Sequence, residues 1–383
     1  MKCKTWQSML AAALLGLAGA AHAEIKVGVL LSLTGPGASL GIPEKNTIEV
    51  LPATLGGQPV RYIVLDDATD TVAATKQARR LVEEEKVDLV IGPSVTPTSL
   101  AALEVFGAAQ TPMISLAGSG AIVLPPEGSR RWAFKLAPNE PTMGAYIFDH
   151  LQATQRKTLA YIGFNTAFGE SFIKEMNKIA ADRGVKVLAD ERYAPTDVSV
   201  TAQTLKVVST QPDAVIIAAS GTAGALPVIE LRKLNYKGQI YLQQGIANAD
   251  FLRVGGRDVD GCLFPVSPVL VAEQLPATNP VRAVALDYLT RYEGKFGSGS
   301  RSLFGATAWD AWVLADKAVP KALEKGAPGS VAFRTALRDA LEQSRDVVGA
   351  QGVFSLSEKD HNGTDRRAQV LVRIEGGKWV LVK

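Results

Sequence analysis

The sequence predicts an α/β fold made of two doubly wound, parallel-sheet lobes. Short runs rich in β-branched residues alternate with longer amphipathic segments, which is typical of parallel sheets covered by helices. This alternation occurs twice, and the second series starts near residue 142. Without an N-terminal leader roughly 360 residues remain, more than a single core usually holds. We therefore expect two lobes.

The N-terminus is typical of a secretory signal peptide. Lys2 and Lys4 supply positive charge, residues 9–21 are apolar, and Ala21-His22-Ala23 forms an A-x-A cleavage site. The apolar segment is shorter than the ~20 residues of a membrane span, and no later stretch approaches that length. We expect cleavage after Ala23, export of the mature chain and no insertion into the membrane.

The first series of elements forms the first predicted sheet. Its expected strands are Ile25–Leu31, Val60–Asp66, Val87–Ile91 and Met113–Ser115, with helices at Thr71–Glu85 and Ser99–Ala108.

The second series repeats this pattern and ends in a group of helices and a hairpin. Its expected strands are Thr158–Gly163, Lys186–Tyr193, Ala214–Ala218 and Gln239–Leu242, with helices at Thr142–Ala153, Gly169–Arg183, Val200–Ser209 and Gly224–Leu234. Further helices are expected at Asn279–Phe296, Gly305–Leu323 and Val331–Gln343, and a β-hairpin at Gln369–Val382.

Composition and charge exclude several kinds of partner. The formal net charge of +3 includes two leader lysines, and acidic and basic residues are interspersed, so nothing indicates nucleic-acid binding. No cysteine or histidine pair has the spacing of metal ligands, and no phosphate-binding glycine motif follows a strand. We expect neither a metal nor another cofactor. Cys262 stands alone after cleavage and is expected to be a buried small hydrophobe.

One motif suggests a hydrolase. Residues 37–41 match the G-x-S-x-G nucleophile elbow, with Ser39 as nucleophile and His361 as the possible base. However, an elbow places its serine directly after the strand, whereas here Thr34-Gly35-Pro36-Gly37 intervenes, and Pro43 is expected to break the helix that an elbow requires. We favour a ligand-lining or structural loop around Ser39, and we expect His150 and His361 at the surface.

Two hydroxyl-rich or glycine-rich turns predict an anion site. Thr96, Thr98 and Ser99 cluster at the start of a helix, where free N–H groups and the positive end of the dipole favour an anion. Residues 116–120 follow the next strand, and small residues such as Gly118 allow backbone N–H groups to approach a ligand. Together the two turns are suited to one carboxylate, although each alone is also consistent with ordinary helix capping.

Five stretches of the mature chain occur in a characteristic order: IKVGVLLSLTGPGASLG, LDDATDTVAATKQARRLVEEEKVDLVIGP, TPMISLAGS, AFKLAPNEP and AFGESF. Together they resemble the periplasmic substrate-binding proteins of branched-chain amino acid type ABC importers, over essentially the whole mature chain. The resemblance implies a type I periplasmic binding protein with three hinge crossovers and no catalysis. It implies lobes of residues 24–141 with 268–346 and of residues 142–267 with 347–383.

The resemblance also implies site residues in the first lobe and at its border. In this family two turns of the first lobe hold the ligand's α-carboxylate, and Thr96, Ala117 and Ser119 occupy the matching positions. Phe168 matches an aromatic residue that packs on the ligand. Leu40 stands where the first loop commonly has an aromatic residue.

The second lobe departs from the family pattern. Amino-acid binders pair the ligand's ammonium with an acid in the loop after strand 239–242, and Gln244 occupies that place. Ser220 falls where a tyrosine is usual. A buried ammonium without a charge partner costs several kcal/mol, so a carboxylate lacking an ammonium fits better, unless Asp250 replaces the missing acid.

The predicted ligand is an aromatic acid of the benzoate or hydroxycinnamate type, and GASLGIPEKN resembles the family's aromatic-acid subgroup. The alternatives are a branched-chain or other aliphatic amino acid or amide, the hydrolase considered above, and a receptor that senses its ligand without transport. The resemblance implies a membrane permease as partner, and we expect a periplasmic monomer.

Overall fold

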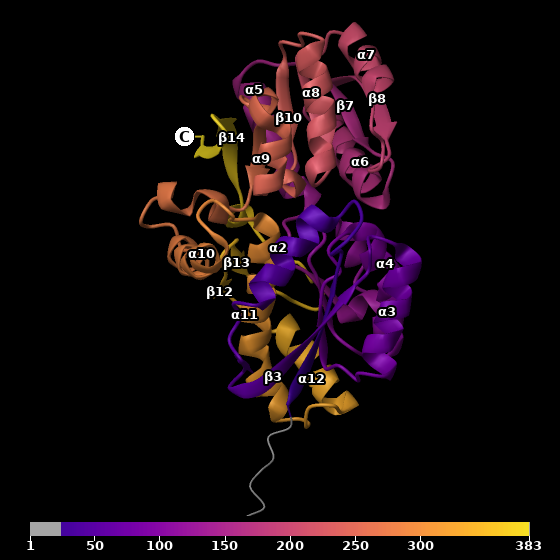
Figure 1. The fold of residues 1–383 in the computed structure, drawn as a ribbon, viewed down its shortest axis with the longest axis vertical. Helices are drawn as coiled ribbons and strands as arrows, with labels where there is room; N and C mark the ends of the chain where they lie inside the picture. Colours follow the sequence, from indigo (N-terminus) through magenta and orange to yellow (C-terminus); the bar gives the residue numbers. More distant parts are fainter. Residues whose placement is uncertain (1–23, 383) are drawn as a thin grey trace, which may run out of the picture.

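The computed structural model describes residues 24–382, which form two α/β lobes stacked along the long axis of the molecule (Figure 1). The predicted signal peptide, residues 1–23, lies outside the described residues. Within residues 24–382, no helix has the length and apolar character needed to cross a membrane.

The first lobe is built on a six-stranded sheet with the order β2-β3-β1-β4-β5-β6. Its strands pair in parallel, except for the antiparallel pair of β2 and β3. The central strand is almost entirely buried, as expected where helices cover both faces. The strands are β1 (Ile25–Leu31), β2 (Thr54–Leu55), β3 (Gln58–Asp66), β4 (Leu89–Ile91), β5 (Met113–Ser115) and β6 (Ala133–Lys135), with helices α2 (Ala38–Ile48), α3 (Thr71–Glu83) and α4 (Thr96–Ala108).

The second lobe is built on a seven-stranded sheet with the order β15-β14-β11-β10-β9-β7-β8. The C-terminal hairpin adds two antiparallel strands to an otherwise parallel sheet. The strands are β7 (Thr158–Phe164), β8 (Lys186–Tyr193), β9 (Ala214–Ala218), β10 (Gln239–Leu242), β11 (Leu263–Val266), β14 (Val370–Glu375) and β15 (Lys378–Leu381), with helices α5 (Glu140–Ala153), α6 (Ala167–Asp182), α7 (Thr201–Ser209), α8 (Ala225–Lys233) and α9 (Ala249–Gly255).

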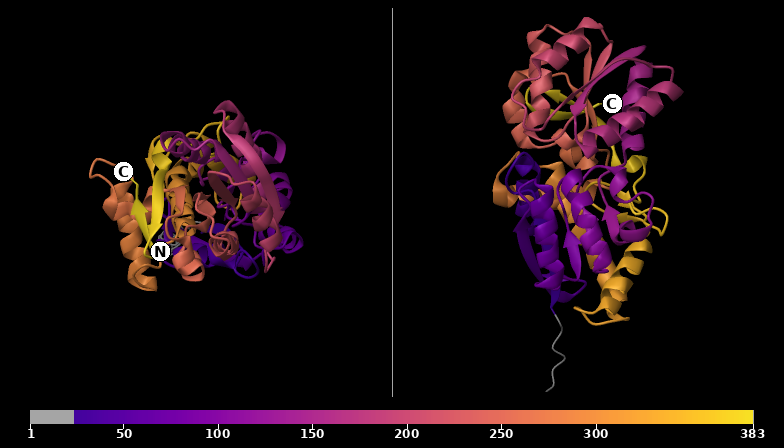
Figure 2. Two further views of the ribbon diagram at one scale, coloured as in Figure 1. Left: turned by 90° about the horizontal axis from the view of Figure 1, so that it is seen from above. Right: turned by 90° about the vertical axis from the view of Figure 1, so that its right-hand side faces the viewer.

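The chain crosses between the lobes more than once. Helices α10 (Arg282–Phe296), α11 (Leu303–Leu323) and α12 (Val331–Glu342) follow the second sheet in sequence. Leu314 and Phe333 of α11 and α12 nevertheless pack into the core of the first sheet. Both side views show α12 in the first lobe and the C-terminal strands in the second (Figures 1 and 2).

The last crossover lies later than the predicted lobe border at residue 347. The strands β12 (Val347–Val348) and β13 (Val353–Phe354) form a short hairpin. Phe354, its last residue, and Leu356, which follows it, both pack into the core of the first sheet. The amide of Lys135 in β6 donates to the carbonyl of His361 at 3.0 Å. The chain therefore enters the second sheet only at Val370, and the remaining lobe borders stay a prediction.

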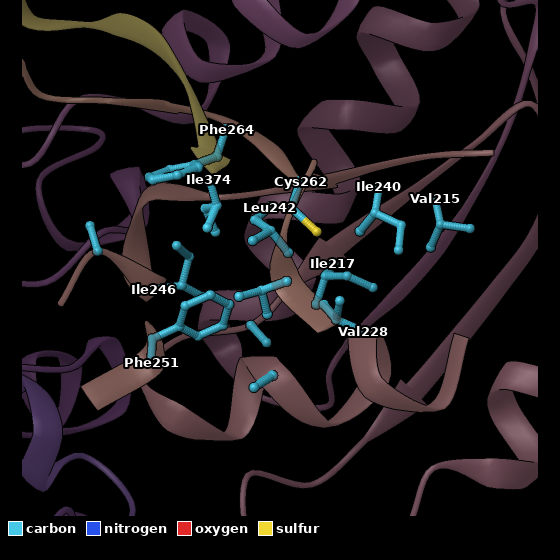
Figure 3. Packing of buried hydrophobic residues seen from close by; sticks show 14 of the residues in the cluster. Val215, Ile217, Val228, Ile240, Leu242, Ile246, Phe251, Cys262, Phe264 and Ile374 are labelled. Atoms are coloured by element: carbon cyan, nitrogen blue, oxygen red, sulfur yellow. The ribbon is translucent and has the colours of Figure 1, made fainter. Parts of the chain in front are cut away.

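Figure 3 shows the core on one face of the second sheet, where Ile217, Leu242 and Phe251 come together. Cys262 lies in this core, and burial raises the pKa of its thiol to about 12. Its predicted role as a buried small hydrophobe is confirmed.

The sequence pattern missed α2, α9, β6 and β11, and it started α4 three residues late. Helix α4 begins at Thr96 because Val95 is extended and Pro97 is suited to a first helical turn.

The expectation that Pro43 ends a helix is wrong, since α2 continues through it. A proline within a helix leaves the carbonyl four residues earlier without its usual donor. Here that carbonyl belongs to Ser39, and Asn248 Nδ2 donates to it at 3.3 Å.

Asp310 in α11 holds the backbone of the last crossover. Its carboxylate oxygens accept from the amides of Ala350 at 2.6 Å and Gln351 at 3.0 Å. The side chain is completely buried, and this burial raises its pKa from 3.8 to about 7, although the backbone hydrogen bonds oppose the rise. Asp310 thus fixes the backbone of this crossover through its carboxyl group.

We expect Asp310 to make the free energy of unfolding depend on pH. A carboxyl whose pKa is raised in the folded state holds its proton more tightly there, so its contribution is complete below pH 3.8 and is lost as pH rises through about 7. Asp310→Asn should flatten the decline of thermal stability over this range. Asp287→Asn, which neutralises an exposed carboxylate, is the control. Parallel declines in wild type and Asp310→Asn would contradict the assignment.

Candidate functional site

A cavity of about 270 Å³ lies between the lobes at the carboxyl ends of strands from both sheets. This is where doubly wound sheets bind ligands. Its walls come from both lobes and from the start of α11. They consist of Pro36, Gly37, Leu40, Thr69, Ser94, Val95, Thr96, Pro97, Leu116, Ala117, Gly118, Ala137, Phe164, Thr166, Phe168, Pro195, Thr196, Ser220, Gln243, Gln244, Gly245, Leu303, Phe304 and Thr307.

None of these lining residues is acidic, basic or a histidine. The wall is mostly apolar, with hydroxyl and carboxamide groups distributed over it. Such a wall offers a charged ligand no ion pair, and any charge must be satisfied by dipoles and hydrogen bonds.

The first-lobe wall contains an uncapped helix start. Val95 precedes α4 and no side chain caps it. The Thr96 hydroxyl is buried, and among residues 24–382 it has no hydrogen-bond partner. Because Thr96 also lines the cavity, its hydroxyl, the first amides of α4 and the helix dipole are available to an anion there.

The neighbouring hydroxyls of this turn serve the fold instead. Thr98 Oγ1 donates to the carbonyl of Val95 at 3.2 Å, and Ser99 Oγ lies 2.9 Å from Ser115 Oγ. Both residues are buried and neither lines the cavity. Of the three hydroxyls expected to face the cleft, only that of Thr96 does.

The second predicted turn contributes mainly through Gly118. Ala117 lines the cavity, but its amide donates to Ser115 Oγ at 3.2 Å. Gly118 is the half-buried residue of this turn, and a Cβ at its position would lie 3.1 Å from the Phe168 ring. Glycine thus allows Phe168, from the opposite lobe, to close against this turn.

Ser119 lies between the lobes and is absent from the cavity wall. Its hydroxyl accepts from the amide of Ala121 at 3.2 Å and donates to Ser171 Oγ in α6 at 2.9 Å. Ser171 donates in turn to Glu140 Oε1 at 2.7 Å. Ser119 therefore joins the lobes, whereas its predicted direct contact with ligand remains a prediction.

Ser39 also lies where the lobes meet. Its hydroxyl is buried, without a partner among the described residues, and a Cβ on Gly221 would lie 2.7 Å from it. Gly221 has a positive φ of 61°, a conformation that glycine adopts readily. The neighbouring Leu40 lines the cavity itself. The close approach of Gly221 to Ser39 and the hydrogen bond between Ser119 and Ser171 both join the two lobes, which are therefore closed on each other.

Two buried carboxyls stand behind the first-lobe wall. Ser94, which lines the cavity, donates its hydroxyl to Glu44 Oε2 and accepts from the amide of Ser32. Ser32 donates to Asp67 Oδ1 at 2.7 Å. Burial raises the pKa of Glu44 well above its usual value and also raises that of Asp67. Neither Glu44 nor Asp67 lines the cavity, so neither carboxyl is placed to pair with an ammonium there.

The second lobe places Phe168 and Ser220 at the cavity, and their contact with a ligand remains a prediction. Phe168 is the second residue of α6, whose start is capped by Thr166. Phe164 and Phe304 add further aromatic surface. Phe164 and Phe304 are not predictable from the sequence as site residues, because nothing in their local pattern separates a cavity phenylalanine from a core one.

Gln244 lies at the cavity and is 3% exposed. Its Oε1 accepts from Gln369 Nε2 at 3.1 Å. The preceding Gln243 is structural, because its amide group bonds the carbonyl of Ala219 and the amide of Gly245. Asp250 does not replace the missing acid, since it does not line the cavity and its side chain, 49% exposed on α9, is paired with Arg253 at 2.9 Å.

The histidines have positions different from those expected. His361 is completely buried, stacks on Phe134 and bonds the carbonyl of Ala133 and Glu342 Oε1 through its two ring nitrogens. His150 is half-buried, with Nδ1 2.6 Å from the Tyr241 hydroxyl. The prediction that both lie at the surface is wrong for His361. With both nitrogens occupied elsewhere, His361 is not a base for Ser39.

The periplasmic binding protein family model matches residues 24–378, and the chain belongs to this family. It is 24% identical to Leu/Ile/Val-binding protein homolog 7 of Brucella suis biovar 1, with 97% of this chain and 94% of that protein covered. An extracellular ligand-binding receptor from Rhodopseudomonas palustris HaA2 is 39% identical, with a TM-score of 0.90 over 94% of this chain and 100% of that one.

A solute-binding protein of an ABC transporter from R. palustris, solved in complex with benzoate, has the same fold. It is 22% identical, with a TM-score of 0.78 over 94% of this chain and 95% of that one. The predicted family and two-lobe fold are thereby confirmed. The protein is a periplasmic binding protein, a ligand-binding receptor and not an enzyme.

Proposed function

We propose that the protein binds a small carboxylate without an ammonium group, an aromatic acid of the benzoate or hydroxycinnamate type, and delivers it as a monomer to a membrane permease. The observation that carries this proposal is the cavity wall, which has no ionisable side chain. The helix start at Thr96 stabilises an anion through hydrogen bonds and the dipole. An ammonium in the same cavity would be buried without an anionic partner.

The apolar part of the wall supports an aromatic body. Phe164, Phe168 and Phe304 reach the cavity from both lobes. Aromatic rings favour offset or edge contacts with one another, which adds to the burial of apolar area. Thr96, Ala117 and Gly118 would hold the carboxylate, while Ser220 and Gln244 would meet polar substituents at the other lobe.

The alternative is a branched-chain or other aliphatic amino acid or amide. The names of the Brucella relatives favour it, whereas the benzoate complex of the R. palustris protein favours an aromatic acid. An amino acid would have to place its ammonium on uncharged carbonyl, hydroxyl and carboxamide oxygens alone, which is the weakness of this alternative.

Calorimetry with 4-hydroxybenzoate, coumarate and leucine tests the proposal. We expect saturable binding of at least one aromatic acid and no response to leucine. The protein is unfolded, dialysed and refolded before titration, because this procedure removes any ligand retained from the cells. Tight binding of leucine with no response to the aromatic acids would overturn the proposal in favour of the amino-acid alternative.

A further inference from the structure

Gln369 is a buried residue next to the site that does not itself line the cavity. It directly precedes β14 at the end of the last crossover and is 2% exposed. Its backbone carbonyl accepts from the Tyr146 hydroxyl at 2.9 Å, which fixes the backbone there. Its side-chain Nε2 donates to Gln244 Oε1 at 3.1 Å. Gln369 thus supports Gln244 from the side away from the ligand.

This support determines which end of the Gln244 amide is free. A carboxamide has an accepting oxygen at one end and a donating NH₂ group at the other. The Gln369 NH₂ group already donates to this oxygen, whereas the NH₂ group of Gln244 has no acceptor among the described residues and is left for a ligand in the cavity. Ser220, its neighbour on the wall, can donate or accept.

We infer that Gln369 is a positioning residue that makes the Gln244 end of the cavity a hydrogen-bond donor, so that the protein selects acids whose distal substituent accepts a hydrogen bond. Ether, carbonyl and phenolic oxygens meet this requirement, whereas an ammonium offers only donors. This inference rests on the proposed binding of aromatic acids. It extends the proposal from the class of acid to the polarity of the substituent.

The matched ligands 4-methoxybenzoate and 4-ethylbenzoate isolate this effect, because they are similar in size and only the former has an acceptor at the distal position. We expect wild-type protein to bind 4-methoxybenzoate about 10-fold tighter, the effect of one satisfied hydrogen bond. Calorimetric dissociation constants for both ligands give the ratio. Equal affinities in wild type would overturn the inference.

Two variants test the role of Gln369. The side chain of Gln369→Glu, when ionised at alkaline pH, offers only acceptors, so Gln244 should turn its NH₂ group toward position 369 and its oxygen toward the ligand, which removes or reverses the preference for the methoxy compound. Gln369→Leu removes the orienting donor without adding charge and should bring the ratio toward one. Gln369→Leu also tests the inference if the buried charge of Gln369→Glu prevents that variant from folding.

Tyr146→Phe is the matched control, because it removes the hydrogen bond to the Gln369 backbone carbonyl without touching the amide pair. Its ligand ratio should equal that of wild type even if both affinities fall. Loss of affinity in the Gln369 variants with an unchanged ratio would show a merely structural role and overturn the inference. Failure of wild type to bind either compound would instead refute the proposed aromatic ligand.

Discussion

Gln244→Glu is expected to weaken binding of aromatic carboxylates by about 100-fold or more near pH 8. The substitution adds a carboxylate to a cavity that has no basic lining residue and that already holds the ligand's negative charge. Neither charge has a cationic partner. Since burial and a neighbouring anion both raise a carboxyl pKa, acidification should neutralise the new side chain and recover part of the affinity. Calorimetry at about pH 8 and about pH 5.5 measures both effects.

The same variant should gain affinity for an α-amino acid such as leucine or phenylalanine, because it supplies the anion that wild type lacks. Gln239→Glu is the matched control. It introduces the same charge at the opposite end of β10, outside the cavity wall, and should leave both ligands unaffected. Undiminished binding of aromatic acids by Gln244→Glu at alkaline pH would show that the ligand does not approach this residue.

Periodicity and turn residues predicted most of the fold because its helices and strands are regular and bury one face or both. The failures occurred where tertiary contacts override local preference. Pro43 remains helical because the other lobe satisfies the carbonyl that proline leaves free. β6 and β11 are short strands of 3 and 4 residues, and no alternation is visible in so few positions.

The candidate site was predicted unevenly for a similar reason. A helix start and small residues after a strand are visible in sequence, so Thr96 and Gly118 were found. Gln369 lies 125 positions from Gln244, and no local pattern joins them. His361 was misplaced because a charged and polar neighbourhood, EKDHNG, suggests a surface turn, whereas the aromatic stack and the Glu342 contact that bury it come from distant segments.

Thr96→Val should weaken every carboxylate ligand by about 10- to 100-fold, whatever the rest of the ligand contains. The substitution keeps the shape of the side chain and removes the one buried hydroxyl of this turn that faces the cavity. A hydrogen bond to a charged group contributes about 1.5–3 kcal/mol, which corresponds to that loss. Thr96→Ser should restore most of the affinity, because it retains the hydroxyl.

Thr98→Val is the control for the same helical turn. Its hydroxyl is buried and donates to the Val95 carbonyl, so its removal is expected to lower thermal stability more than ligand affinity. Titrating both variants with two acids that differ at the distal end separates the carboxylate grip from the selection made at Gln244. The Thr96→Val loss should be the same for both acids, since it acts on the group they share. A loss confined to one acid, or an equal loss in Thr98→Val, would place the carboxylate elsewhere in the cavity.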